Sequence, residues 1–163
     1  MKNGMQTVAV AATLVLAGSA MADFYDGAGF EIPDSDPAGF SSTIVVGDGF
    51  TVTDVNVTLN DLSHTWVGDL IVSLEAPDGS MVDLMHRTGD TSGGFGDSSD
   101  LGGTYTFDDS ATGDWWATAG ALGGGDVMPS GAYFATGING AVTSLGSLAG
   151  GSAAGNWTLH ISD

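Results

Sequence analysis

Apolar residues recur at every second position over much of the chain, which is the spacing of strands that bury one face in a sheet. Leu70, Val72 and Leu74 share one face, residues 77–79 (Pro-Asp-Gly) predict a tight turn, and residues 81–85 alternate again. This pattern predicts a β-hairpin. Further strands are predicted at 43–46, 50–53, 55–59, 104–107, 132–135 and 157–161.

Seven or eight such strands, with 27 glycines and four prolines, predict an all-β fold, an antiparallel β-sandwich. The alternation slips in phase near Asp54, where we expect a β-bulge. Residues 88–103 and 108–130 are rich in Gly, Ser, Thr and Asp and are predicted to be long loops.

The N-terminus has the pattern of a secretory signal peptide. Lys2 precedes the apolar stretch 8–16, and Ala20-Met21-Ala22 is a small-x-small cleavage site. We therefore predict a signal peptide over residues 1–22, cleaved after Ala22, a lead-in segment or first strand over 23–45, and one domain over 46–163. The predicted mature chain is secreted or held in the cell envelope. No other run is long and apolar enough to insert into a membrane.

Charge narrows the possible partners. The chain has 20 acidic and two basic residues, with a formal net charge of −18. Nucleic acid binding requires clustered Lys and Arg, so nucleic acid is excluded as a partner. The acidic surface favours cations instead, calcium above all. Because there is no cysteine, the domain depends on its core for stability rather than on disulfides.

A Ser/His/Asp hydrolase is the first chemistry to test, because His64 and Asp69 are close in sequence and Ser92 lies in a glycine-rich loop. The chymotrypsin-type loop places its serine directly after the aspartate, and here Thr91 stands between them. No Gly-x-Ser-x-Gly turn is found either. We predict that this chain alone is not an enzyme and has no catalytic residue.

The same residues have structural interpretations. Gly68 is expected to supply a positive φ, and Asp69 to accept hydrogen bonds from loop amides at the start of a strand. Arg87, the one basic residue after the predicted cleavage site, is expected to form an ion pair. The three histidines lack metal-ligand spacing, and we expect them at strand ends, donating to carbonyl groups.

The loop carboxylates have two interpretations: a solvated surface or a calcium site. Ca²⁺ takes six to eight oxygen ligands, which acidic, glycine-rich loops can provide. The spacing matches neither an EF-hand nor a nonapeptide repeat. The candidate calcium ligands are Asp90, Asp97, Asp100, Asp108 and Asp109.

Carbohydrate binding is an alternative function, because exposed aromatic rings stack on sugars. Trp115 and Trp116 lie in a predicted loop, with Tyr105 and Tyr133 nearby in sequence. One tryptophan of an adjacent pair can face inwards while the other faces solvent, so the pair is compatible with core packing as well.

Two separated motifs carry a resemblance to a known family. The stretch "HTWVGDLIVSLEAPDGSMVDLMHRTG" and the later "GNWTLHISD" resemble the P domain, or P/Homo B domain, of kexin- and furin-type proprotein convertases, in its bacterial branch. "TYTFDDSATGDWW" between them is similar to that branch. The residues that carry the resemblance are His64, Thr65, Gly68, Asp69, Leu70, Arg87 and Trp157.

The resemblance covers roughly residues 46–163 and implies a jelly-roll sandwich of the galactose-binding-like kind. In that family the catalytic residues belong to a separate subtilisin-like domain, which the P domain stabilises and whose calcium dependence it influences. It implies a non-catalytic module whose partner is an exported subtilisin-like protease, with a surface glycan as the alternative. Bacterial members continue with a final strand, which we expect this chain to lack.

Overall fold

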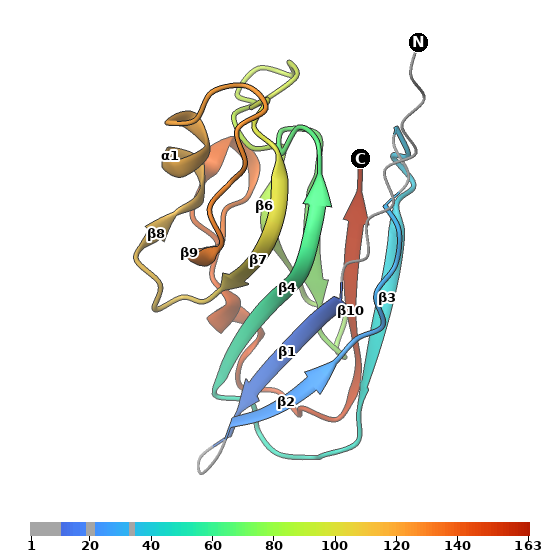
Figure 1. Ribbon diagram of the computed structural model, residues 1–163. Helices are drawn as coiled ribbons and strands as arrows, with labels where there is room; N and C mark the ends of the chain where they lie inside the picture. The colour runs from blue at the N-terminus through green and yellow to red at the C-terminus, as the bar shows by residue number, and fades with distance from the viewer. Residues whose placement is uncertain (1–10, 19–21, 33–34) are drawn as a thin grey trace.

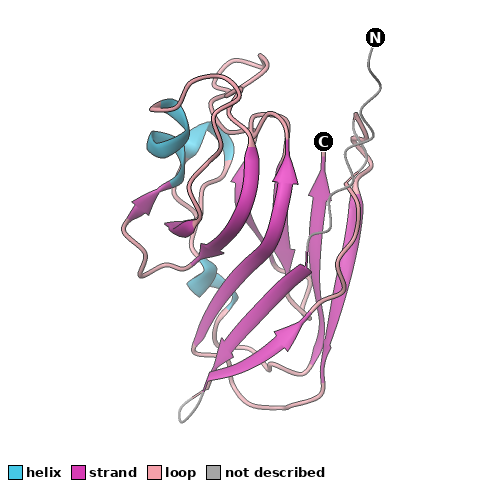
Figure 2. Cartoon of the chain, in the orientation of Figure 1, coloured by secondary structure: helices cyan, strands magenta, loops and turns pink. Residues whose placement is uncertain are grey.

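The fold is a sandwich of two β-sheets, seen in a computed structural model that describes residues 11–18, 22–32 and 35–163 (Figures 1 and 2). The strands are β1 (Ala11–Ala17), β2 (Ala22–Asp26), β3 (Phe40–Val46), β4 (Asp54–His64), β5 (Ile71–Glu75), β6 (Met81–His86), β7 (Leu101–Phe107), β8 (Gly113–Asp114), β9 (Gly131–Phe134) and β10 (Gly155–Ser162). The helices are α1 (Trp115–Gly120) and the 3-10 turns η1 (Ile138–Gly140) and η2 (Leu145–Leu148).

The larger sheet has six strands in the order β2-β1-β4-β7-β9-β8, and the smaller has four in the order β3-β10-β5-β6. Most neighbours are antiparallel, but β9 pairs in parallel with both β7 and β8. The prediction of an all-β sandwich is confirmed. The described residues form ten strands rather than about eight: β1 and the two-residue β8 were not expected, β2 lies where a lead-in segment or first strand was expected, and the predicted strand 50–53 forms only an isolated bridge at Thr51.

The core lies between the two sheets and is filled by the inward positions of the alternating strands. In β10, Trp157, Leu159 and Ile161 are each at most 2 % exposed, as their shared face predicted. The predicted hairpin is confirmed as β5 and β6, and Gly79 takes a φ of +86° in the turn between them. Alternation therefore located the core strands correctly.

Two local predictions were wrong. No bulge occurs at Asp54, because β4 begins there; the register against β7 shifts instead between Leu59 and Leu62, beside Asp61 with a φ of +52°. The predicted loop 108–130 contains α1, whose first turn is capped by the Asp114 carboxylate accepting from the Ala117 N–H at 2.9 Å. A six-residue helix is too short to show a helical period in the sequence.

The N-terminal segment 11–17 lies inside the sandwich. This segment, which falls within the predicted signal peptide, forms β1 between β2 and β4. The predicted lead-in 23–45 contains most of β2 and of β3. Signal-peptide cleavage, the domain boundaries and the missing final strand stay predictions; Lys2 and Ala20-Met21 lie outside the described residues. No helix in the described ranges is long and apolar enough to cross a bilayer.

Candidate functional site

The first motif forms the corner at which the chain passes from the larger sheet to the smaller one. After β4 ends at His64, Thr65 is exposed and Trp66 takes a left-handed conformation with φ of +63°. The Asp69 N–H then donates to the Trp66 carbonyl at 3.0 Å, which closes a turn, and Leu70 is fully buried. The motif residues thus build a tight turn between two core strands.

Gly68 is required at this corner by space rather than by its backbone angle. The prediction of a positive φ at Gly68 was wrong, since Trp66 carries that conformation. A Cβ on Gly68 would lie 2.8 Å from the Cα of Gly96, closer than real Cβ contacts. The Gly68 N–H also donates to the Asp97 carbonyl at 3.0 Å. The corner therefore depends on close contact with the loop that follows β6.

The motif histidine is buried within the fold. His64 is 6 % exposed, and its Nε2 lies 3.6 Å from Oδ2 of Asp163, whose side chain is 5 % exposed. The same Asp163 oxygen accepts the Ser35 N–H at 2.7 Å. His64 therefore links the end of β4 to the end of β10. No open cleft or serine hydroxyl is part of this arrangement among the contacts that the structure describes.

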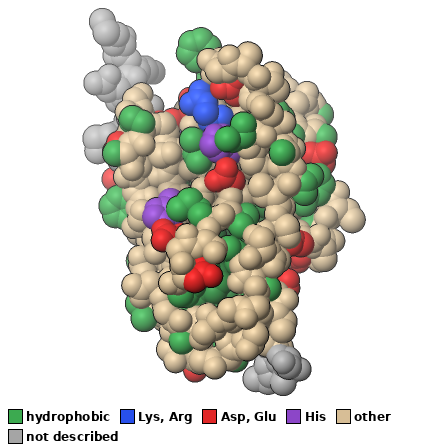
Figure 3. All heavy atoms as spheres, turned by 180° about the vertical axis from the view of Figure 1, so that it is seen from behind, with side chains coloured by type: hydrophobic (Ala, Val, Ile, Leu, Met, Phe, Trp, Pro, Cys, Tyr) green, Lys and Arg blue, Asp and Glu red, His purple; other side chains and the backbone are tan. Residues whose placement is uncertain are grey.

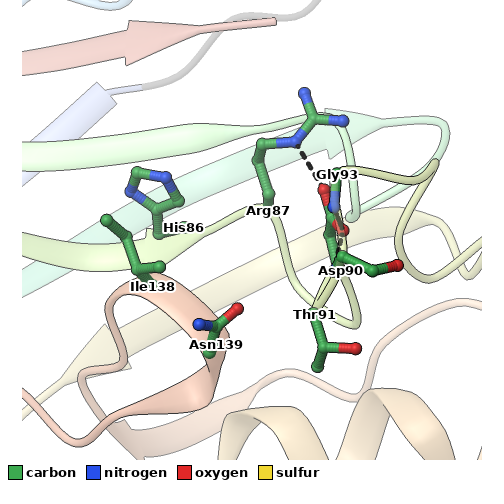
Figure 4. A pocket seen from close by; sticks show the side chains of 8 residues that line it. His86, Arg87, Asp90, Thr91, Gly93, Ile138 and Asn139 are labelled. Atoms are coloured by element: carbon green, nitrogen blue, oxygen red, sulfur yellow. Dashed lines mark hydrogen bonds and ion pairs between the residues drawn. The ribbon is translucent and has the colours of Figure 1, made fainter.

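Arg87 and Asp90 organise the glycine-rich loop (Figure 4). Arg87 Nε donates to Asp90 Oδ2 at 3.3 Å and Nη2 to the Gly94 carbonyl at 2.9 Å, which confirms the predicted ion pair. Asp90 Oδ1 accepts the N–H groups of Ser92, Gly93 and Gly94 at 2.7–3.0 Å. Hydrogen bonds from these amides, helped by Arg87, lower the pKa of Asp90 to about 2.

A hollow of about 210 Å³ lies beside this loop. His86, Arg87 and Thr91 form one side of it, and Ile138 and Asn139 of η1 the other (Figure 4). Arg87 is the one Lys or Arg among the described residues, and Figure 3 shows one blue area, the colour of Lys and Arg, next to a purple histidine area.

The other candidate calcium ligands lie in two loops, Asp97 and Asp100 with Asp90 before β7, and Asp108 and Asp109 after it, and each accepts hydrogen bonds. Asp97 accepts from the Ser99 N–H and hydroxyl, Asp100 from the Trp66 N–H and Asp108 from the Ser110 N–H. Within the described part of the chain, no three His, Cys, Asp or Glu side chains are grouped as metal ligands.

Asp109 joins two segments that are far apart in sequence. Its carboxylate accepts from the Ser144 hydroxyl and from the N–H groups of Leu145 and Gly146 at 2.6–3.0 Å. Burial raises the pKa of this carboxyl, but the three hydrogen bonds outweigh that effect and hold it below its usual value. The five candidates thus lie in two loops and accept hydrogen bonds there, and calcium binding by them stays a prediction.

The paired tryptophans belong to the core side of α1. Trp115 is fully buried and its Nε1–H donates to the Thr88 hydroxyl at 2.9 Å, while the Tyr105 and Tyr133 rings pack edge-on against it. Trp116 is partly buried against the core. Trp115 is therefore unavailable for stacking on a sugar, which corrects its candidate role.

Besides Phe24 and Phe40, the exposed aromatic rings of the described residues include Trp66 and Phe95, which the sequence did not single out. They are 41 % and 78 % exposed, and their rings meet edge-on with centroids 6.2 Å apart. The Trp66 N–H donates to Asp100 Oδ1 at 3.1 Å, which holds the Trp66 backbone in place at the corner. We call this pair the aromatic corner. In the sequence Trp66 lies between Thr65 and Val67, and this position gave no signal of its exposure.

A serine, a histidine and a carboxylate do meet elsewhere, on the outer face of the four-stranded sheet. Ser41 Oγ and His160 Nδ1 are hydrogen-bonded at 2.8 Å, and His160 Nε2 and Glu75 Oε2 at 2.8 Å. The order matches a catalytic triad, but the serine contacts Nδ1 and the carboxylate Nε2, the reverse of the serine-protease arrangement. His160 lies in a central strand, whose backbone amides pair with β3 and β5 instead of forming an oxyanion hole.

The histidine partners differ from the prediction. His64, His86 and His160 all face carboxylates rather than carbonyl groups, and His160 lies within a strand rather than at its end. Two of these contacts, His64 with Asp163 and His160 with Glu75, join residues more than eighty positions apart and cannot be inferred from local sequence, whereas His86 contacts Asp83 within its own strand.

Comparison with known proteins agrees with this architecture. The sequence model of the family described as "Proprotein convertase P-domain" matches residues 52–118. Leupeptin-inactivating enzyme 1 of Streptomyces exfoliatus is 37 % identical over 99 residues, which are 56 % of this chain and 20 % of that protein, so the chain spans about a fifth of its relative's length. No solved structure matches. The P-domain family is associated with subtilisin-like proteases, and the resemblance of this chain to it is confirmed over residues 52–118.

Proposed function

We propose that the chain is an exported, non-catalytic binding module that docks on a subtilisin-like serine protease and stabilises it. The family association supports a protease as the kind of partner. The name of the Streptomyces relative, an enzyme that inactivates the peptide leupeptin, points towards proteins that act on peptides. The predicted signal peptide supports export.

The observation that carries the docking role is the aromatic corner. Large, exposed rings on a rigid backbone bury much area on binding and lose little side-chain freedom. The Trp66 N–H donates to Asp100. Gly68 packs against Gly96, the residue that follows Phe95 in the sequence. The partner surface that fits this corner is an apolar pocket for the two rings. The groups around that pocket must be able to lie close to the carboxylates of this chain without repulsion.

The non-catalytic role rests on where the hydrolase candidates lie. His64 is buried beside Asp163. Ser92 lies in the loop that follows β6, where its backbone N–H donates to Asp90. The Ser41–His160–Glu75 group lies on an open sheet face. The serine contacts Nδ1 of His160 and the glutamate contacts Nε2, which is the reverse of the serine-protease arrangement.

Catalysis is tested with purified chain and fluorogenic peptide substrates, with and without calcium. The expected result is no hydrolysis above that of a boiled sample. Turnover that Ser41→Ala or Ser92→Ala abolishes would contradict the non-catalytic role. Both variants are needed, because the two serines belong to separate groups.

Docking is tested on the exported subtilisin-like protease activity of the source organism. Culture supernatants from strains with and without this gene are heated, and the residual protease activity is measured. We expect faster loss of activity without the gene, restored by the wild-type chain but not by Trp66→Ser with Phe95→Ser. Val45→Ser is the matched control, since Val45 is 74 % exposed on a sheet face away from the corner. Equal heat loss in all strains would contradict a stabilising partner role.

Glycan binding is the second candidate function, and the same two rings carry it. A sugar ring can stack on Trp66 as it would on any exposed aromatic face. The test is binding of the chain to a glycan array. Binding that is lost in Trp66→Ser and kept in Trp116→Ser would favour this function over protease docking.

Calcium is proposed as a stabilising ligand of the acidic loops, and it is tested by chelation. A metal bound only by the folded state raises the thermal midpoint, so excess EDTA would lower that midpoint. A midpoint that does not change on chelation removes calcium from the proposal.

A further inference from the structure

The strand β1 covers one edge of β4 from Asp54 to Asn60. Seven residues pair in antiparallel register, from Ala11 opposite Asn60 to Ala17 opposite Asp54. The inward side chains of β1 meet apolar partners on β4 that are at most 1 % exposed: Ala12 opposite Leu59, Leu14 opposite Val57 and Leu16 opposite Val55. This edge thus requires an apolar strand to complete the core (Figure 1).

The same residues form the apolar centre of the predicted signal peptide. Cleavage after Ala22 would remove β1, leave the β4 edge unpaired over seven residues and take from β2 the one strand neighbour it has in the described sheet. An uncovered apolar edge of this length is a template for another strand. The folded domain and the cleaved domain therefore have different partners at this edge.

The fit of β1 to the edge is incomplete on one face. Val15 lies opposite Asn56, whose Oδ1 is buried and has no hydrogen-bond partner among the described residues. Elsewhere in the molecule, directly opposed threonines form such bonds: Thr58 with Thr106 at 2.9 Å and Thr43 with Thr158 at 3.2 Å. A hydroxyl at the Val15 position would give the Asn56 oxygen a donor by the same geometry.

We propose that the β4 edge over Asp54–Asn60 is a strand-acceptor site. Residues 11–17 occupy it before processing. Afterwards it binds an extended antiparallel segment with aliphatic side chains at the three inward positions and a serine or threonine opposite Asn56. This recognition uses main-chain pairing for affinity and alternate side chains for selection. It is independent of the aromatic corner and of the protease partner.

The test uses the full chain with a site for a specific protease introduced at residues 19–21, between β1 and β2. After cutting, we expect the N-terminal fragment to co-elute with the remainder in size-exclusion chromatography. An excess of labelled peptide of residues 10–18, with lysines added for solubility, should displace it, while the Leu14→Asp, Leu16→Asp peptide should not. A Val15→Thr peptide should bind about 2- to 10-fold more tightly, the range of one hydrogen bond.

A second measurement avoids cutting the chain. Val15→Thr in the intact protein should raise the thermal midpoint. The matched control is Val45→Thr, because Val45 also faces an asparagine, Asn156, but both are exposed, and its midpoint should not change. The proposal is overturned if the cut fragment separates with no change in the midpoint of the remainder, or if the leucine and aspartate peptides bind equally.

Discussion

Each sheet has a central strand that is paired with a strand from the N-terminal part of the chain: β10 with β3, and β4 with β1. These two N-terminal strands are held differently. β3 pairs with β10 through buried Ile44 and Val46 on the inner face and through Ser41 and Thr43 on the outer face, both hydrogen-bonded to β10. β1 pairs with β4 through buried leucines on the inner face and through Thr13, which accepts from Asn60 Nδ2 at 3.0 Å, on the outer face, but it leaves Asn56 Oδ1 without a donor. β1 is therefore matched to β4 less completely on its outer face than β3 is to β10, and the missing contact lies at Asn56.

The largest expected effect tests whether β1 belongs to the cooperative fold at all. Leu14→Ala and Ile44→Ala each remove a buried aliphatic side chain, one from β1 and one from β3. Each should lower the free energy of unfolding by about 2–5 kcal/mol in urea titrations of the full chain. Loss of stability in Ile44→Ala alone would show that β1 is not part of the folded core.

The next effect concerns the corner that joins the two sheets. Gly68→Ala places a methyl group against the backbone of Gly96 and should cost about 1–3 kcal/mol. Gly47→Ala is the control, because a Cβ there meets nothing within 4 Å. Thermal melts of both variants separate steric crowding from the general effect of losing a glycine. Equal midpoints would mean that the close approach is not maintained in solution.

A smaller effect is expected on the outer face of the four-stranded sheet. His160→Gln and Ser41→Ala break the polar contacts that join β3, β10 and β5. Cross-strand pairs of this kind contribute roughly 0.2–1 kcal/mol each, and the partial exposure of His160 favours the lower end. A double-mutant cycle in urea measures the coupling, and a value of zero would leave β3 held by its inner face alone.

The smallest effect depends on pH and lies outside both strand pairs. The pKa of Asp90 is about 2 in the folded chain and roughly 4 in an unfolded one. Its ionised form therefore stabilises the loop above pH 4, and this stabilisation is lost as the pH falls from about 4 to 2. Asp90→Asn should lower the midpoint at pH 6 and differ less from wild type at pH 2. A constant difference would assign the effect to something other than this carboxylate.

The sequence predicted the strands whose apolar residues alternate without interruption. The hairpin of β5 and β6 and the buried face of β10 are correct because a two-residue period is a local property. It did not predict α1, because six residues with a capping Asp114 give no period. Nor did it predict β1, because an apolar run of that length fits a signal peptide and a buried strand equally well.

The candidate site was predicted in part. The ion pair of Arg87 was predicted because many carboxylates are available to it, but its partner Asp90 was expected as a calcium ligand instead. The aromatic corner and the Ser41–His160–Glu75 contacts were not found, since they depend on exposure and on the register of distant strands. Glycine at position 68 was recognised as necessary, but for the wrong reason, because the approach of Gly96 is a tertiary contact.

The neighbouring positions of Asp36 and Asp163 have a mechanical consequence. The Asp163 N–H donates to the Asp36 carbonyl at 3.3 Å, just beyond the antiparallel pairing of Ile161 with Phe40. Tension applied between residues 36 and 163 would load these pairs one after another, as in opening a zipper, rather than all at once in shear. A domain tethered through these two points would open at low force, starting with the contact that Asp163 makes to Ser35 and His64.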